Sequence, residues 1–131
     1  MRLLEHQSKK LLASFGLVFT PAIVVQIAET AVQAAKQLQA SSFVLKAQVP
    51  FGGRGKAGAV KFAETTVEAE RLARDLLAME LRGAKVTSVS VEPKIAFVRE
   101  FYAGIAWDTQ AKLPVALLSI SGGVDVEQSL H

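Results

Sequence analysis

A cluster of glycines between two strand-like segments constrains this sequence more than any other feature. Residues 50–58 (PFGGRGKAG) hold four glycines in nine residues. The residues before them, 43–49 (FVLKAQV), alternate as a strand does, and 59–63 (AVKFA) have extended character again. Glycine permits positive φ angles and lets backbone N–H groups approach an anion. The loop is interpreted either as a phosphate-binding lid or as a solvated hairpin turn, and the residue types alone leave both open.

Three known phosphate-binding patterns can be tested against this loop. The P-loop pattern G-x-x-x-x-G-K-[ST] fails, because proline stands at its first glycine and alanine at its last position. Gly53, Gly55 and Gly58 meet the dinucleotide pattern G-x-G-x-x-G, but no helix follows to bind a pyrophosphate. The kinase pattern is also met, with Val60 last, yet the other kinase motifs are absent. What remains is a glycine lid between two strands.

Lys46 lies in the strand-like segment before the loop, seven residues ahead of Gly53. A lysine among apolar residues costs desolvation energy unless it has an anionic partner. Taken alone, an edge-strand lysine that faces water is the simpler interpretation. Its position beside the glycine loop favours a phosphate ligand, and Arg54, Lys56 and Lys61 add positive charge there.

Two carboxylates, Glu92 and Glu100, lie within apolar, strand-like segments. Ionised carboxylates only accept hydrogen bonds, so in a nucleotide site they typically contact ribose hydroxyls or an adenine amino group. On spacing alone, two solvent-facing strand residues are the better interpretation. Metal sites built on cysteine or on several histidines are disfavoured, because the chain has no Cys and only two His, far apart.

The hydrophobic pattern predicts an α/β chain, folded as an α+β two-layer sandwich with a mixed or antiparallel sheet. A capping box from Thr65 to Glu68 predicts the start of the third helix, and Gly83 its end. The expected helices cover 4–15, 29–39 and 66–81, and the expected strands cover 22–27, 43–49, 59–63, 86–92, 95–107 and 113–120.

Composition excludes several classes of protein. With 131 residues, 50% of them hydrophobic, the chain can bury a real core, and disorder is disfavoured. The balance of 15 Lys+Arg against 12 Asp+Glu gives +3, which only slightly favours an anionic partner. No apolar stretch is long enough to span a membrane, and polar residues interrupt any signal peptide. The absence of cysteine fits a cytoplasmic protein.

Taken together, the motifs resemble the N-terminal ATP-grasp segment of the β subunit of ADP-forming succinyl-CoA synthetase, a family related to malate–CoA ligase and ATP-citrate lyase. The resemblance covers nearly the whole chain and implies an ATP-grasp N-terminal lobe, with helices on one side of a mixed or antiparallel sheet. It is carried by LEHQSK at 4–9 with Gly16, VLKAQV at 44–49, GGRGKAG at 52–58, VK at 60–61 and GGVDVE at 122–127.

The resemblance also implies a reaction and a set of site residues. Family members convert a carboxylate, CoA and ATP to acyl-CoA, ADP and phosphate, through an acyl phosphate and a phosphohistidine. That histidine belongs to the α subunit, so neither His6 nor His131 receives the role. The nucleotide-binding residues implied are Lys46 for phosphate, Gly53, Arg54 and Gly55 as the glycine lid, the carboxylates Glu92 and Glu100, and Ile95 through its backbone.

Several points follow from the resemblance about domains and partners. Residues 1–20 are expected to form a lead-in helix that packs on the second ATP-grasp lobe, 21–108 the small lobe, and 109–131 the start of the second lobe. The nucleotide is ATP or GTP, and the Mg²⁺ ligands are expected beyond residue 131. Ser121 stands where the family usually has Glu. The implied partner is an α subunit or a C-terminal remainder, and neither nucleic acid nor membrane is expected.

Two alternatives to a ligase fragment stay open. Family β subunits are longer than this chain, which is not expected to be active alone, because phosphoryl transfer needs its metal and both lobes. A truncated, non-catalytic paralogue that acts as an interaction module would have the same sequence features. A small basic nucleic-acid binder is the third interpretation and rests on the pI alone.

Overall fold

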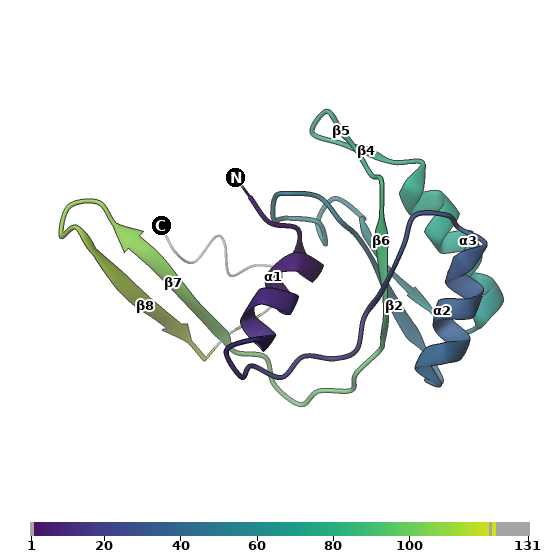
Figure 1. Cartoon of the computed structure of the whole chain (residues 1–131), viewed down its shortest axis with the longest axis horizontal. Coiled ribbons are helices and arrows are strands. Elements are labelled where there is room, and N and C mark those ends of the chain that lie inside the picture. Colours follow the sequence, from purple (N-terminus) through teal and green to yellow (C-terminus); the bar gives the residue numbers. More distant parts are fainter. Residues whose placement is uncertain (1, 121, 123–131) are drawn as a thin grey trace. The chain divides into compact units, whose positions relative to one another are not determined.

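The computed structural model describes residues 2–120 and 122 and divides into two units, Met1–Lys94 and Ile95–His131. The second unit holds β7 (Tyr102–Asp108) and β8 (Leu113–Ser119). The elements of the first unit, shown with these in Figure 1, are α1 (Glu5–Ala13), β1 (Ile23–Val25), α2 (Thr30–Leu38), β2 (Phe43–Ala47), β3 (Val60–Ala63), α3 (Thr66–Leu77), β4 (Glu80–Leu81), β5 (Ala84–Lys85) and β6 (Val89–Pro93).

The first unit is built on a four-stranded sheet with the order β1-β6-β2-β3, and every pairing in it is antiparallel. Lys46 on β2 is directly opposite Ser90 on β6. Successive side chains alternate between the two faces of a strand. Lys46, Ser90 and Glu92 therefore share one face of the sheet, while the apolar residues between them share the other.

The apolar face of the sheet carries the core of the first unit. Helices α2 and α3 lie side by side against this face (Figure 1). Small alanines on the helix surfaces let the helices approach the sheet closely, and the larger side chains come from the strands and from α3. The residues that form this layer include Phe43, Leu45, Val89 and Val91 from the strands, and Ala31, Ala35, Ala69, Leu72, Ala73 and Leu76 from the helices. The predicted α/β sandwich is confirmed.

Helix α3 begins where the capping box predicts. The Thr65 hydroxyl accepts a hydrogen bond from the Glu68 backbone N–H at 3.1 Å. The predicted end near residue 81 is wrong, because the helix stops at Leu77. The residues that follow form the short β4–β5 hairpin, whose turn places Arg82 at φ 51° and Gly83 at φ 79°. Gly83 therefore serves a hairpin turn and not a helix end.

The described part of the second unit contains an antiparallel hairpin of β7 and β8. The strand expected over 95–107 is wrong in its first part, because regular pairing starts only at Tyr102. In the turn, the Asp108 carboxylate accepts hydrogen bonds from the backbone N–H groups of Gln110 and Ala111, at 2.8 and 2.9 Å. Residues 123–127 of the GGVDVE motif lie outside the described residues, as do Ser121 and His131.

Candidate functional site

The polar face of the sheet, opposite α2 and α3, carries a buried carboxylate. Glu92 is 4% exposed. Its Oε2 accepts a hydrogen bond from the Lys46 Nζ at 3.0 Å, and its Oε1 accepts one from the Ser90 hydroxyl at 2.9 Å. A buried charge is tolerated only when it is paired and hydrogen-bonded, and both oxygens of Glu92 meet that condition.

Helix α1 adds a second acid and a second base to this face. Glu5 and Lys9 are one turn apart on the helix and pair at 2.8 Å. The Lys9 Nζ also donates to Glu92 Oε2 at 2.9 Å, and the Lys46 Nζ lies 3.3 Å from Glu5 Oε1. Each lysine therefore bridges the same two carboxylates, one from the helix and one from the sheet.

A hydrogen-bonded glutamine fixes α1 to the sheet at the same place. The Gln48 Oε1 accepts from the His6 backbone N–H at 3.2 Å and lies 3.0 Å from the His6 Nδ1. The Gln48 amide nitrogen donates to the Lys46 carbonyl and to the Ser90 hydroxyl, both at 3.1 Å. The side chain is buried, and its polar atoms are all used in joining the helix to two strands.

The glycine loop contributes Arg54 to the same set of charges. Its Nη1 donates to the Ala47 carbonyl at 3.0 Å, and its Nη2 donates to Glu5 Oε2. The loop folds back on itself through a hydrogen bond from the Ala59 N–H to the Arg54 carbonyl at 2.9 Å. Gly53 and Gly58 have φ angles of 75° and 68°, values that side-chain-bearing residues rarely adopt. The glycines therefore shape the turn that holds the guanidinium in place.

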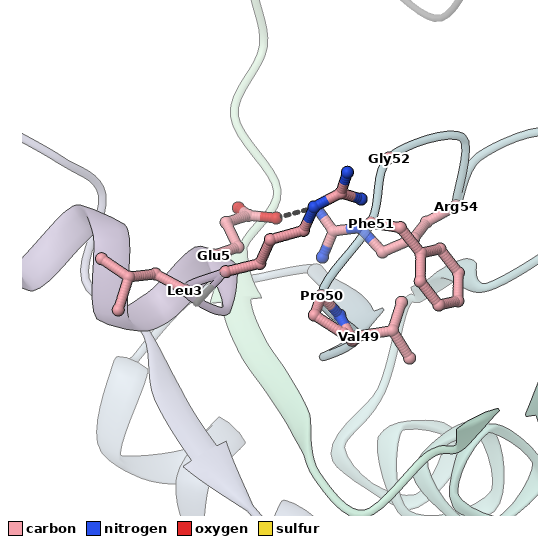
Figure 2. Close-up of a pocket in the computed structure, with 8 residues that line it drawn as sticks. Leu3, Glu5, Val49, Pro50, Phe51, Gly52 and Arg54 are labelled. Atoms are coloured by element: carbon pink, nitrogen blue, oxygen red, sulfur yellow. Dashed lines mark hydrogen bonds and ion pairs between the residues drawn. The ribbon is translucent and has the colours of Figure 1, made fainter.

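Beside this cluster lies a pocket of about 480 Å³ between the N-terminal segment and the loop. Figure 2 shows Glu5 and Arg54 on its wall, joined by the dashed line of their ion pair. The guanidinium of Arg82, from the β4–β5 hairpin, lies 5.0 Å from the centre of the Phe51 ring, so the hairpin supports the loop side of the pocket. The lining residues are Arg2, Leu3, Glu5, Val49, Pro50, Phe51, Gly52 and Arg54.

The electrostatics of the cluster centre on Glu5. Burial would raise the pKa of its carboxyl group, but the hydrogen bonds from Lys9 and Arg54 and the charge of Lys46 outweigh burial and lower the pKa to about 2. Burial would likewise lower the pKa of the Lys9 ammonium, yet its bonds to Glu5 and Glu92 raise it. The two shifts favour the charged forms of Glu5 and Lys9, in a cluster that brings together three basic and two acidic side chains.

The nucleotide-binding residues predicted from the sequence are distributed over both units. Lys46, Gly53, Arg54, Gly55 and Glu92 lie in the first unit, and Lys46, Arg54 and Glu92 belong to one connected ion-pair network. Two further residues, Ile95 and Glu100, lie in the second unit, where both are exposed.

Sequence reasoning missed Glu5, Lys9 and Gln48 as members of this cluster. Both residues of the helical pair lie in the LEHQSK motif, but the motif gave them no role, and the i, i+4 spacing of an acid and a base occurs on many solvated helices. Among residues 2–120 and 122, no group of three or more His, Cys, Asp or Glu side chains is placed to hold a metal ion. No helix in the described part of the chain is long and apolar enough to cross a membrane.

Comparison with known proteins decides the family. A profile of the ATP-grasp domain matches residues 2–130. The chain belongs to the ATP-grasp family. The ATP-grasp chain is 43% identical over 128 residues to the β subunit of the ADP-forming succinate–CoA ligase of Rubrobacter xylanophilus, and 41% identical to the β subunit of the GDP-forming enzyme of Thermus thermophilus. Both alignments cover 98% of this chain, which spans about a third of the length of each relative, 33% and 34%.

Solved structures show the same ATP-grasp-type fold. A protein of Pyrococcus horikoshii superposes with a TM-score of 0.80 at 21% identity, over 96% of this chain and 55% of its own. An acetyl-coenzyme A synthetase of Ca. Korarchaeum cryptofilum gives a TM-score of 0.78 at 22% identity, over 92% of this chain and 54% of its own. The resemblance inferred from the glycine loop and its flanking strands is confirmed at the level of family and fold.

Proposed function

We propose that this chain is the N-terminal nucleotide-binding part of an ADP-forming acyl-CoA ligase β subunit of the succinyl-CoA synthetase kind. In the complete enzyme the reaction would convert a carboxylate, CoA and ATP to acyl-CoA, ADP and phosphate. The observation that carries the proposal is the convergence of Lys46 and Arg54, from a strand and from the glycine loop, on one anion, the Glu5 carboxylate.

The two cations fit a phosphate chemically. An ammonium group has three N–H donors and a guanidinium has five, so Lys46 and Arg54 retain donors beyond the bonds described above. Charge-assisted hydrogen bonds to phosphate oxygens are among the stronger ones in proteins. Lys46 and Arg54 would hold phosphate oxygens, and the turn at Gly53 and Gly55 would let the loop backbone approach them. Glu92, Glu100 and the backbone of Ile95 stay proposed contacts to the rest of the nucleotide.

The described residues offer no ready-made cage of side chains for magnesium. Mg²⁺ is usually held by one or two carboxylates together with substrate phosphates, and within residues 2–120 and 122 no group of three or more His, Cys, Asp or Glu side chains is placed to hold a metal ion. Its protein ligands are proposed to lie beyond residue 131. ATP and GTP stay open, because ADP-forming and GDP-forming relatives are about equally similar to this chain.

The proposal extends to partners and to domain limits. The partner would be an α subunit, which supplies the phosphohistidine, or a C-terminal remainder of the same chain, in the cytoplasm. Residues 21–108 would form the small ATP-grasp lobe, with 1–20 as a lead-in that packs on the second lobe and 109–131 as the beginning of that lobe.

A second function, that of a non-catalytic interaction module, is favoured by one observation. Within the described residues 95–120 and 122, no side chain is buried, and Ile105, Trp107 and Leu118 expose 83%, 64% and 83% of their surfaces. An exposed apolar surface of this kind marks an interaction site. This candidate shares the fold and differs from the ligase fragment in having no use for the nucleotide.

Calorimetric titration with Mg-ATP separates the two functions. The Lys46→Ala variant should bind about 10–100-fold more weakly than the wild type, because it loses a charge-assisted hydrogen bond to phosphate. Lys94→Ala is the matched control, since Lys94 is exposed and pairs with Glu64. Circular dichroism would verify that each variant is folded. Equal ATP affinity in folded Lys46→Ala and wild-type chains would contradict the phosphate role, and no binding with or without an α subunit would favour the interaction module.

A further inference from the structure

Glu5 is the common acceptor for cations from three different elements. It receives Lys9 from α1 at 2.8 Å, Lys46 from β2 at 3.3 Å and Arg54 from the glycine loop. A carboxylate is an anionic, two-oxygen acceptor, and cations that bind phosphate bind it in the same way. Glu5 therefore already occupies the position at which Lys46 and Arg54 would meet a phosphate group.

A phosphate group cannot join this arrangement without opposing Glu5. Oxygens bound to Lys46 and Arg54 would lie within a few ångströms of the Glu5 carboxylate, and like charges at such distances in a part-buried site repel. The third cation, Lys9, also pairs with Glu92. Glu92 is buried in strand β6, so its carboxylate has little room to move away. Of the two carboxylates in the cluster, Glu5 is thus the one that can move away.

Helix α1 is held in a way that allows such movement. It has no buried residue. Polar contacts through Glu5, His6 and Lys9 attach it to the sheet and to the glycine loop. Leu11 on this helix and Phe15 in the turn that follows it expose 52% and 76% of their surfaces, so they add little apolar packing. Elements with few buried contacts open at low free-energy cost, and α1 is such an element.

We propose that Glu5 is an internal competitor for phosphate: it closes the nucleotide-free site by binding Lys46 and Arg54, and nucleotide phosphate displaces it and loosens α1. The inference rests on the proposed nucleotide function of the same two cations. The competitor role can be distinguished from a role in which Glu5 only orients Lys46 and Arg54, because the two roles predict opposite effects of removing the Glu5 charge. A competitor that loses its charge leaves phosphate binding tighter, whereas an orienting residue that loses its charge leaves it weaker.

The test is titration of the wild type, Glu5→Gln and Glu29→Gln with inorganic tripolyphosphate, followed by Mg-ATP. Glu5→Gln should bind tripolyphosphate roughly 3–10-fold more tightly, the range expected when one opposing charge is removed from a part-buried site. Glu29→Gln makes the same change in net charge at the exposed Glu29–Arg74 pair and should shift affinity less than about twofold. Circular dichroism and thermal unfolding would show that both variants are folded.

Hydrogen exchange of the wild type supplies a readout that needs no substitution. Saturating tripolyphosphate should speed amide exchange in α1 and leave exchange in α3 unchanged. Slower exchange in α1 on binding, or equal or weaker binding by folded Glu5→Gln, would overturn the competitor role while the nucleotide function stands. Failure of both the wild type and Glu5→Gln to bind tripolyphosphate or Mg-ATP would overturn the nucleotide function and the competitor role together.

Discussion

The two units of this chain both contain antiparallel strands, yet among the described residues only the first unit has a core. On β2, every second residue is buried, because α2 and α3 cover one face of the sheet. On β7 and β8 the same kind of alternation leaves every residue exposed or half-buried. Alternation in sequence thus predicts that a segment is a strand, but burial depends on what packs against it. The first unit carries its own covering layer, and the described part of the second unit does not.

The largest expected difference between the units is the effect of removing a phenylalanine. Phe43 on β2 is 2% exposed, whereas Phe101 in the second unit is 63% exposed. Phe43→Ala should lower the free energy of unfolding by about 3–5 kcal/mol, because it leaves a cavity in the core. Phe101→Ala should change it by about 0.5 kcal/mol or less. Urea unfolding followed by circular dichroism measures both, and similar losses would show that the second unit is packed as well as the first.

A smaller difference is expected in amide exchange. Amides in β2 and β6, at the centre of the four-stranded sheet, should exchange at least about 100-fold more slowly than those in β7 and β8. An isolated two-stranded hairpin is marginally stable in water, so its hydrogen bonds open often. Exchange followed by NMR or mass spectrometry resolves the strands. Equal protection in both pairs of strands would mean that the β7–β8 hairpin is covered.

The smallest expected effect is the loss of folding stability at acidic pH. The folded-state pKa of Glu5, about 2, lies below its usual value of 4.5, so its ion pairs stabilise the fold above pH 4.5 and are lost as the pH falls towards 2. After allowance for solvent screening, the loss is on the order of 1–2 kcal/mol. Glu5→Gln should flatten this part of the curve of stability against pH. Asp108→Asn in the second unit, where backbone N–H groups lower the pKa of an exposed carboxyl, should alter it less.

Local signals predicted much of the first unit. The capping box at Thr65 located the start of α3, and the polarity pattern around Lys46 located β2. The end of α3 was missed, because the apolar residues after Leu77 continue a helical spacing while the chain turns through Arg82 at a positive φ, a conformation that arginine does not signal. Pairing of β4 with β5 across this short turn makes the segment a hairpin and not a continuation of the helix.

The site was predictable only in part, for a different reason. Lys46 and the glycine loop are close in sequence, so their association follows from local order. The Glu5 carboxylate meets Lys46 and Arg54 across 41 and 49 residues of chain. A charged helix surface is usually solvated, and nothing in the helix itself indicates such distant partners. The antiparallel register of β2 and β6, with α1 laid over their polar face, is what brings them together.

The strand order of the sheet has a consequence for how the chain is made. β6 is the last strand of the first unit to be synthesised, yet it lies between β1 and β2, and it pairs Ile23 with Val91. The β2–β3 hairpin can form early from near neighbours, whereas β1 has no partner in this sheet until β6 arrives. Closing so long a loop slows folding. During synthesis on the ribosome, β1 therefore keeps its backbone N–H and C=O groups unpaired within this sheet until residues 89–93 have emerged and β6 can pair with it.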